Sequence, residues 1–257
     1  MGSHFENLSS NTLFHFTGSL KNLTGILAST FLPRYCLEVP NFFKKIPFNS
    51  NLAYPMVCFC DIPLSKVKRH IGLYGNYGIG LSKEWAIKNN LSPVIYTRKN
   101  AKTANTIENL ISWFDSIQEK LSEDDKFIFR KSYSELLMHL KPYYGNMIKD
   151  GKIIKKRFYD EREWRWIPEL DPKLFRSHLL KDEFNDQNIK EVENKKIAVF
   201  RKLNFKPEDI RYLIINNDDE IDSFIQDLES IKVNFNSRAI KKLTSRIITN
   251  DQIIKDF

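Results

Sequence analysis

The sequence predicts an α+β fold, in which a mixed sheet core carries a two-helix insertion, in a single domain over residues 12–257. The first observation is a β–α–β spacing, with a strand at 77–81, a helix that begins after Ser82 and a strand at 93–97. The second is a change of pattern near residue 101, after which apolar residues repeat with helical period, so 101–150 is expected to be a helical insertion. With 257 residues, 42% of them hydrophobic, the chain can bury a sizeable core.

The N-terminal third alternates strands with short helices. Residues 13–17 (LFHFT) are β-prone, Ser19 is placed to cap a helix with apolar side chains at helical spacing, and Pro33 is expected to end that helix. Four prolines between residues 33 and 55 predict an irregular loop over a site. The elements expected next are a buried strand at 55–60, a short helix with Val67, His70 and Ile71, and a tight turn near Gly75-Asn76.

The second half is expected to return to the sheet after the insertion. Two helices joined near residues 122–125 should make up the insertion. The elements expected after it are strands at 155–168, 196–203 and 211–216, a helix at 218–231, and a short strand around 246–248 followed by a final helix turn.

Composition limits the classes of function and partner. Lysine plus arginine number 40 against 32 acidic residues, which gives a net charge of +8 and an isoelectric point near 9.2. This surplus is compatible with a phosphate-bearing partner such as nucleic acid or a dinucleotide, although a solvated basic surface accounts for it more simply. No run of 18 apolar residues and no signal peptide are visible, so we expect a cytoplasmic protein without a membrane partner.

The cysteines predict neither a disulfide framework nor a metal site. There are three of them, Cys36, Cys58 and Cys60, and the last two have the spacing C-x-C. An odd number in this pattern fits no four-ligand zinc site, so we expect reduced thiols and no metal.

His15 is the first candidate site residue. On a strand, Phe14 and Phe16 point to one face and His15 to the other, together with Thr17. A histidine and a nearby hydroxyl form a donor and acceptor pair suited to a ribose or a phosphate. The alternative is a histidine buried in the core with its hydrogen bonds satisfied.

The second candidate segment is EREWRW at 161–166. If all of it is strand, Glu161, Glu163 and Arg165 share one face, while the two tryptophans share the other and predict that it is buried. Glu163 could then line a cleft, where a carboxylate can orient a sugar hydroxyl or stabilise a developing cation. The alternative is a solvated edge strand with cross-strand ion pairs.

Further candidates are weaker. Arg34 fits a solvent-facing loop as well as a binding role, and Asp61 fits a turn. Tyr77 could stack on a planar ring, although an aromatic residue flanked by glycines also fits the core. The stretch YGNYGIG precedes a strand rather than a helix, so it is not a dinucleotide-binding fingerprint.

Several segments together resemble the AbiGi family of abortive-infection phage-resistance proteins. They are LFHFTGSLKNLTGIL, FLPRYCLE, MVCFCDIPLSKVKRHIGLYGNYGIGLSKEWAIKNNLSPVIY and FYDEREWRWIP, over roughly residues 12–215. Members of this family are usually described as the antitoxin partner of a two-gene system. The resemblance therefore implies a role in phage defence and a cognate toxin or antitoxin as partner.

The opening strand with H-x-T, followed by a helix, also resembles the start of DarT-like ADP-ribosyltransferases, which place a glutamate on a late strand. This resemblance implies an ADP-ribosyltransferase-like fold and NAD as co-substrate. It assigns Glu163 and His15 to catalysis, and His15, Thr17, Arg34 and Tyr77 to NAD binding. The transition state in such enzymes is oxocarbenium-like, as in glycoside cleavage. The chain departs from the pattern in its arginine- and tryptophan-rich glutamate strand and lacks a full second motif.

Three functions follow as hypotheses. The chain could be an enzyme that transfers ADP-ribose to nucleic acid or protein, a non-catalytic antitoxin or sensor that binds a partner protein, or a nucleic-acid-binding protein. The enzyme hypothesis requires His15 and Glu163 to line one cleft.

Overall fold

The computed structural model describes residues 9–40, 42–43, 51–149, 152–231 and 235–256, and they form the mixed α+β fold that the sequence predicts. The strands of its main sheet are β1 (Thr12–Thr17), β2 (Arg34–Glu38), β3 (Leu52–Cys60), β4 (Tyr77–Ser82), β5 (Ser92–Pro93), β10 (Glu163–Trp166), β11 (Leu179–Leu180), β12 (Ile210–Ile215) and β13 (Ile247–Thr249). The spatial order is β13-β12-β4-β1-β3-β10-β5, and β2 and β11 also pair with β3. Only β12 and β13 are parallel among these pairs, so the sheet is mixed.

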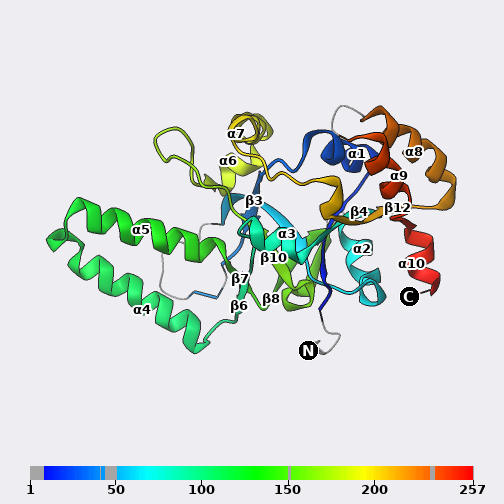
Figure 1. Cartoon of the computed structure of the whole chain (residues 1–257). Coiled ribbons are helices and arrows are strands. Elements are labelled where there is room, and N and C mark those ends of the chain that lie inside the picture. The colour runs from blue at the N-terminus through cyan, green and yellow to red at the C-terminus, as the bar shows by residue number, and fades with distance from the viewer. Residues whose placement is uncertain (1–8, 41, 44–50, 150–151, 232–234, 257) are drawn as a thin grey trace, which may run out of the picture.

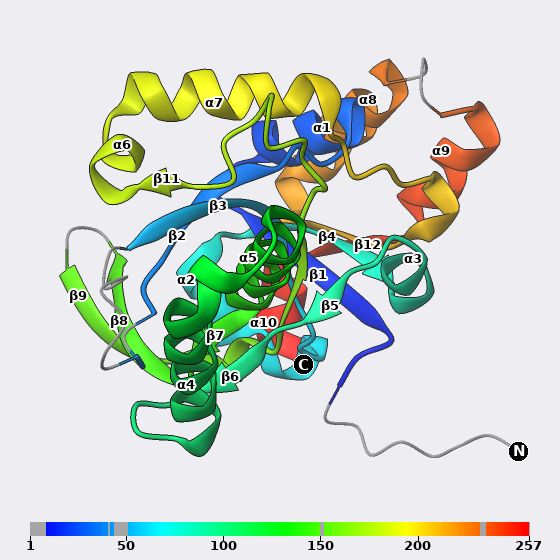
Figure 2. The ribbon, with the colours of Figure 1, turned by 90° about the vertical axis from the view of Figure 1, so that its left-hand side faces the viewer.

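Helices cover both faces of this sheet. The α-helices are α1 (Leu20–Ser29), α2 (Lys68–Tyr74), α3 (Lys83–Lys88), α4 (Lys102–Ile117), α5 (Glu123–Met138), α6 (Lys181–Asn185), α7 (Gln187–Phe200), α8 (Ile221–Ser230), α9 (Ser237–Thr244) and α10 (Asn250–Asp256). Short 3₁₀ turns are η1 (Leu64–Lys66), η2 (Gln118–Lys120), η3 (Phe158–Glu161), η4 (Pro207–Asp209) and η5 (Asp218–Glu220). Figures 1 and 2 show α1, α8 and α9 over one face of the sheet, with α2 and α10 over the other.

Each face has its own apolar core, as alternation along the strands requires. The larger core joins Leu13, Phe59 and Ile79 of the strands to Leu23 of α1 and Phe224 of α8. The smaller core joins side chains of the opposite parity to α2 and α10: Phe14, Phe16, Cys60, Ile71, Ile214 and Ile253. The site described below lies beside the smaller core.

Local signals in the sequence account for the region around β1. The Ser19 hydroxyl accepts from the Asn22 amide at 3.2 Å and caps α1, and the Ser82 hydroxyl caps α3 in the same way. Gly75 has φ +128°, a conformation that glycine adopts without strain, and a Cβ there would lie 2.1 Å from the Thr17 carbonyl oxygen. The turn therefore brings β4 directly alongside β1, with which it pairs over six residues.

The two helices expected after residue 101 are present and project from the sheet as an arm (Figure 1). We call α4, η2 and α5 the arm. The Ser122 hydroxyl caps α5, and the rings of Phe114 and Phe129 stack at 3.8 Å between the two helices. The arm ends at Met138, short of the expected residue 150.

Strands follow the arm at once. They are β7 (Leu140–Pro142), which pairs with β6 (Ile95–Thr97), and β8 (Tyr144–Lys149), which pairs with β9 (Lys152–Arg157). We call β8 and β9 the ribbon.

Four expectations about secondary structure were wrong. Residues 196–203 lie mostly in α7, because the cap that starts this helix, Asp186, lies ten residues upstream of the apolar cluster that suggested a strand. The proline-rich stretch 33–55 contains β2 and the start of β3. Segment 93–97 is divided between two sheets, since β5 pairs with β10 and β6 with β7. Segment 155–168 is broken by η3 and by Arg162, which has a φ of +45°.

Candidate functional site

A cavity of about 230 Å³ with ionisable side chains in its walls lies where β1 and β3 separate. These two strands share one residue pair, Phe14 with Cys60, whereas β1 and β4 share six. The side chains around the cavity come from β1, β2, β3, β7, β10, α2 and η3, and include His15, Glu38, Cys36, Cys58, His70, Tyr74, Lys141, Glu161 and Glu163. We call this space the inner cavity.

Glu163 is held by two cations. Arg165, whose side chain is completely buried, donates from Nε to Glu163 Oε1 at 2.7 Å and from Nη2 to Glu38 Oε1 at 2.7 Å. Its third bond goes from Nη1 to the carbonyl oxygen of Met138 at 2.5 Å. Lys141 pairs with the other oxygen of Glu163. The carboxylate therefore has a fixed position with a cation at each oxygen.

Glu161 joins the same network although it lies in η3 rather than on the strand. Lys141 Nζ is 3.1 Å from Glu161 Oε2, and Lys156 Nζ is 2.6 Å from Glu161 Oε1. The hydroxyl of Tyr74 donates to Glu161 Oε1 and accepts from Lys156 at 3.0 Å. The predicted proximity of Glu161 and Glu163 thus occurs through Lys141, not through a shared strand face.

The network keeps both glutamates ionised. Burial alone raises the pKa of Glu163, but Lys141 and Arg165 outweigh it, and the net pKa is lowered. The same balance, with Lys141 and Lys156 as the cations, lowers the pKa of Glu161. Three carboxylates (Glu38, Glu161 and Glu163) thus meet three cations (Lys141, Lys156 and Arg165), so the cluster has no net charge when all are ionised.

His15 reaches the inner cavity from the gap between β1 and β3. Its Nδ1 lies 2.8 Å from the carbonyl oxygen of Cys58, which in a regular ladder would accept from a β1 amide. Because a carbonyl only accepts, Nδ1 carries the proton and Nε2 is left as an acceptor. Burial lowers the pKa of His15, partly offset by this hydrogen bond, so the ring is neutral near pH 7.

His15 and Glu163 line the same cavity from opposite faces of the sheet. Glu163 and Phe14 both pair with Cys60, so they share a face, and His15 points to the other. The His15 ring packs against Phe31 and Phe59 of the larger core. Since β3 alone lies between β1 and β10, the two backbones are roughly 10 Å apart at a strand spacing of about 4.8 Å.

The other sequence candidates lie away from the inner cavity. Thr17 accepts from the Asn22 side chain at 3.0 Å beside the N-terminus of α1. Arg34 is exposed and pairs with Glu191 of α7 at 3.3 Å. Tyr77 donates to Glu220 at 2.7 Å and packs at the larger core. Asp61 is buried and pairs with Lys83 at 2.7 Å, which supports the backbone at the end of β3.

An open groove of about 490 Å³ adjoins the inner cavity, and the two share His70 and Glu161. Basic residues on both of its sides face this space: Lys66 and Arg69 before and in α2, and Arg157 and Arg162 around η3. We call it the outer groove. The site therefore combines ionised carboxylates in the inner cavity with cations in the adjoining groove.

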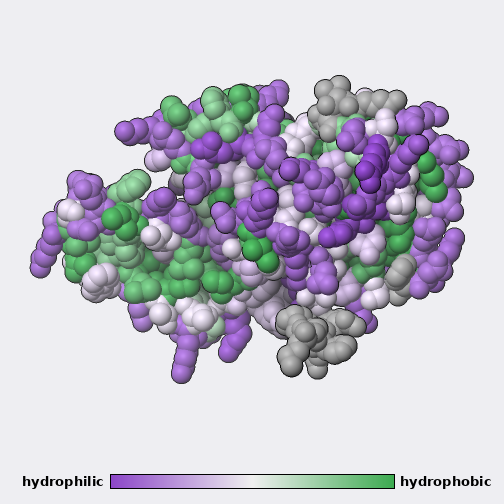
Figure 3. All heavy atoms as spheres, viewed as in Figure 1, coloured by the Kyte–Doolittle hydropathy of each residue, from purple (hydrophilic) through white to green (hydrophobic). Residues whose placement is uncertain are grey.

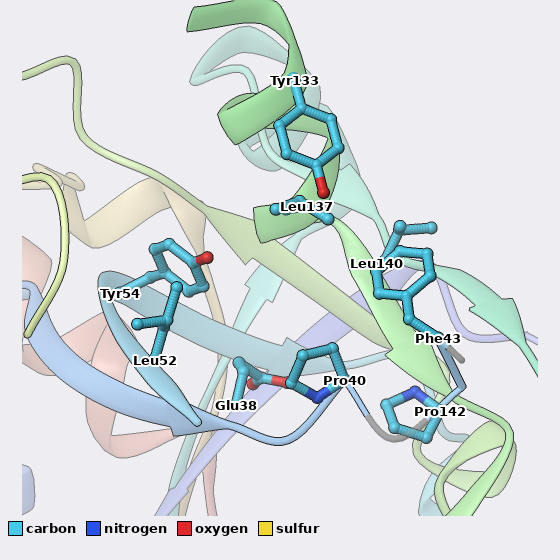
Figure 4. A pocket seen from close by; sticks show the side chains of 9 residues that line it. All are labelled: Glu38, Pro40, Phe43, Leu52, Tyr54, Tyr133, Leu137, Leu140 and Pro142. Atoms are coloured by element: carbon cyan, nitrogen blue, oxygen red, sulfur yellow. The ribbon is translucent and has the colours of Figure 1, made fainter. Parts of the chain in front are cut away.

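A second, smaller cavity lies at the base of the arm (Figure 4). Its volume of about 20 Å³ holds no more than one water. Its walls are mainly apolar, with Phe43, Leu137 and Leu140 among them, and Glu38 lies at the edge that it shares with the inner cavity. This space is too small for a substrate.

The sequence pointed to Glu163 but missed most of its partners. Lys141 follows the arm by three residues, and no local pattern distinguishes it from the other lysines. Arg165 was the exception, because alternation placed it on the same face as Glu163, and the structure confirms this.

The described residues offer neither a cluster of metal ligands nor a helix that could span a membrane. They contain no group of three or more His, Cys, Asp or Glu side chains arranged to hold a metal ion, and their cysteines are free thiols. No helix in the same ranges is long and apolar enough to cross a bilayer.

Comparison with known proteins gives consistent matches. The family model described as "Putative abortive phage resistance protein AbiGi, antitoxin" matches residues 29–216, which include Lys141, Glu161 and Glu163. The "Abortive phage resistance protein AbiGi" of Lactococcus lactis subsp. cremoris is 32% identical over 249 residues, covering 88% of this chain and 99% of that protein. No solved structure matches the chain.

Proposed function

Since the chain belongs to the AbiGi family of abortive phage resistance proteins, we propose that it acts in phage defence through an NAD-binding, ADP-ribosyltransferase-like site. The observation that carries the proposal is the inner cavity itself, where Glu163 is held ionised beside a cationic outer groove. In this reading the resemblance to DarT-like enzymes extends to His15 and Glu163, and the roles of Thr17, Arg34 and Tyr77 in NAD binding are not part of the proposal.

The donor set fits NAD. Its diphosphate needs cations, which Arg69, Arg157 and Arg162 supply in the outer groove. Its ribose hydroxyls need acceptors, and Nε2 of His15 and the oxygens of Glu163 can both accept. When bound, NAD would supply an ADP-ribosyl group whose bond to nicotinamide breaks as a nucleophile of the target forms a bond to the same carbon.

The residues of the chain would position the sugar and stabilise its developing positive charge. A carboxylate has about four lone-pair directions, so Glu163 can bind Arg165 and Lys141 and still accept from a hydroxyl. Because the two cations fix the carboxylate before any ligand arrives, little reorganisation is needed when charge develops. Lys141 and Arg165 act as positioning residues in this scheme.

Nicotinamide release from NAD by the purified chain tests the proposal, with and without added nucleic acid and protein as acceptors. Glu163→Gln is expected to slow release at least ~100-fold, a typical effect of losing one preorganised charged group. Glu135→Gln, which alters an exposed glutamate of the arm, is the matched control and should release nicotinamide at the wild-type rate. Absence of release by the wild type under every condition, or equal rates in Glu163→Gln and wild type, would overturn the proposal. Thermal melts of each variant separate loss of chemistry from loss of fold.

A second candidate function is a non-catalytic antitoxin, which binds a cognate toxin protein through the arm. The observation in its favour is the apolar surface of the arm (Figure 3), where Trp113 is 56% and Ile128 60% exposed, with Leu110 and Phe127 also exposed. Charges of both signs surround this surface at the tip of the arm, where Lys126 pairs with Glu123 at 2.8 Å. The partner surface would therefore be apolar with a polar rim.

Co-expression with the genes that neighbour this one, as sources of a candidate toxin, tests this candidate. Leu110→Ser/Trp113→Ser should lower the yield of co-purified toxin at least ~10-fold without changing the melting temperature, since both residues are exposed. Val192→Ser/Val199→Ser, an equally exposed pair on α7, is the matched control. An undiminished complex in the arm variant would exclude the arm as the interface.

A further inference from the structure

A continuous cationic path leads from the outer groove onto the ribbon. A second open space of about 490 Å³ lies along the ribbon, beside Tyr144, Asn146 and Lys155, and it shares Lys156 and Arg157 with the outer groove. The two acidic residues of the outer groove are already paired, Asp160 with Arg157 at 2.6 Å and Glu161 with Lys156. The path is therefore positive, and the NAD site proposed above uses Arg69, Arg157 and Arg162 at its groove end but not the ribbon.

Three cations on this path have no carboxylate partner within the ranges that the structure describes. Lys66, Arg69 and Arg162 form no ion pair there. Arg162 has a φ of +45°, an uncommon conformation for a residue with a long side chain. This conformation places its guanidinium 6.0 Å from the centre of the Tyr159 ring, over the outer groove.

A row of four tyrosines runs beside the cations. Tyr144 contacts Tyr143 at 4.7 Å between ring centres, Tyr143 stacks on Tyr159 at 5.2 Å, and Tyr159 meets Tyr96 at 5.3 Å. Tyr144 is 60% exposed and Tyr159 is 42% exposed, although exposure of an aromatic ring to water is unfavourable. At its inner end the row touches the site, because the amide of Glu163 donates to the Tyr96 hydroxyl at 2.9 Å.

We propose that the outer groove and the ribbon bind single-stranded nucleic acid, with cations on the phosphates and the exposed tyrosines against the bases. Cations at successive positions match a repeating phosphate backbone. Flat rings beside them match unpaired bases, because bases in a duplex have no free face to stack on a side chain. An acidic protein could also form ion pairs with these cations, but it has no bases to stack on the exposed tyrosine rings. The inference does not depend on NAD chemistry.

Binding of fluorescent 20-mers to the full chain, measured by anisotropy at several salt concentrations, tests the proposal. The probes are single-stranded DNA, single-stranded RNA and the DNA duplex of one mixed sequence. Either single strand should bind more tightly than the duplex, and the comparison of DNA with RNA identifies which it is. With about three to five phosphate contacts, the plot of log K against log salt should have a slope of about −2 to −3.5.

Two variants separate the cations from the rings. Lys66→Ala/Arg69→Ala should weaken binding at least ~10-fold and reduce the slope by about 1.4. Tyr144→Ala should weaken binding about 5- to 100-fold and leave the slope unchanged, as expected for lost stacking. Lys195→Ala/Arg238→Ala, which removes the same number of charges on α7 and α9, is the matched control and should keep most of the affinity.

Four results would overturn the inference. They are no binding to any probe at low salt, equal or tighter binding to the duplex, equal losses in the cation variant and its control, and no effect of Tyr144→Ala. The second and fourth would indicate general attraction of polyanions rather than a single-strand site. The variants alter exposed side chains, so unchanged melting temperatures are expected, and they verify that each protein is folded.

Discussion

Replacement of Arg165 by methionine is the sharpest test of how the inner cavity is built. Arg165 is completely buried and makes three short hydrogen bonds, two of them to carboxylates. Methionine fills much of the same volume but leaves Glu163 buried with only Lys141, and Glu38 without its cation. Breaking a buried ion pair by removing one partner costs about 3–5 kcal/mol, because the remaining charge is left uncompensated. For a chain of this size that free energy corresponds to a fall in melting temperature of roughly 6–20 °C.

Urea unfolding followed by tryptophan fluorescence measures this change, since Trp164 and Trp166 flank Arg165 on β10. Arg157→Met is the matched control: it removes an arginine that also pairs with a carboxylate, Asp160, but at the surface, so its unfolding midpoint should stay nearly at the wild-type value. A loss below ~1 kcal/mol for Arg165→Met would refute the reasoning. It would mean that the carboxylates regain water, and that the network does not hold the cavity together.

Three further predictions concern pH and the backbone. The pKa of Glu163 is lowered in the folded state, so its stabilisation is present above about pH 4.3 and is lost as pH falls; urea midpoints should drop less below pH 5 in Glu163→Gln than in the wild type. Burial lowers the pKa of His70 to about 4, so between about pH 6.5 and 4 the unfolded chain binds a proton that the folded chain does not. Stability should therefore fall as pH drops through this window, and His70→Asn should flatten the fall in midpoint. Gly75→Ala should destabilise the chain by more than ~1 kcal/mol in the same assay, because φ there is +128° and the new methyl group meets the Thr17 carbonyl.

The sequence predicted those elements whose signals are local. Ser19 and Ser82 are helix caps, and a cap acts within three residues, so α1 and α3 could be placed from the sequence. Alternation also predicted that Phe14 and His15 face opposite sides of β1. It held over Glu163–Trp166 but failed at 161–162, because Glu161 lies in η3 and the left-handed backbone of Arg162 resets the alternation before the strand begins.

The site was only half predictable for a related reason. Glu163 stood out because it lies opposite two tryptophans, whose face was expected to be the buried one. In the structure the tryptophans are half-buried and Glu163 is buried, and a buried carboxylate requires compensating cations that the sequence pattern does not locate. Two of these cations are Lys141 of β7 and Lys156 of β9. Lys141 pairs with both glutamates and Lys156 with Glu161, and these contacts form only when the chain folds. Long-range contacts of this kind have no periodicity that could reveal them.

The balance of charges in the inner cavity indicates that the charged network serves ligand binding and not the stability of the fold. Three carboxylates and three cations that are buried or largely buried do not stabilise a fold more than well-packed apolar side chains of the same volume would, and they often stabilise it less. A core that served packing alone would therefore have no need of them, whereas a cavity that must bind a polar ligand requires charged groups whose positions are already fixed. The network adjoins the outer groove through Lys156 and Glu161 and touches the tyrosine row through Glu163, so it lies where both proposed ligands would meet. If both ligands bind, the ribose of NAD and the single-stranded nucleic acid would both approach Glu163. Binding of these ligands would then account for the buried charges, which fold stability does not explain.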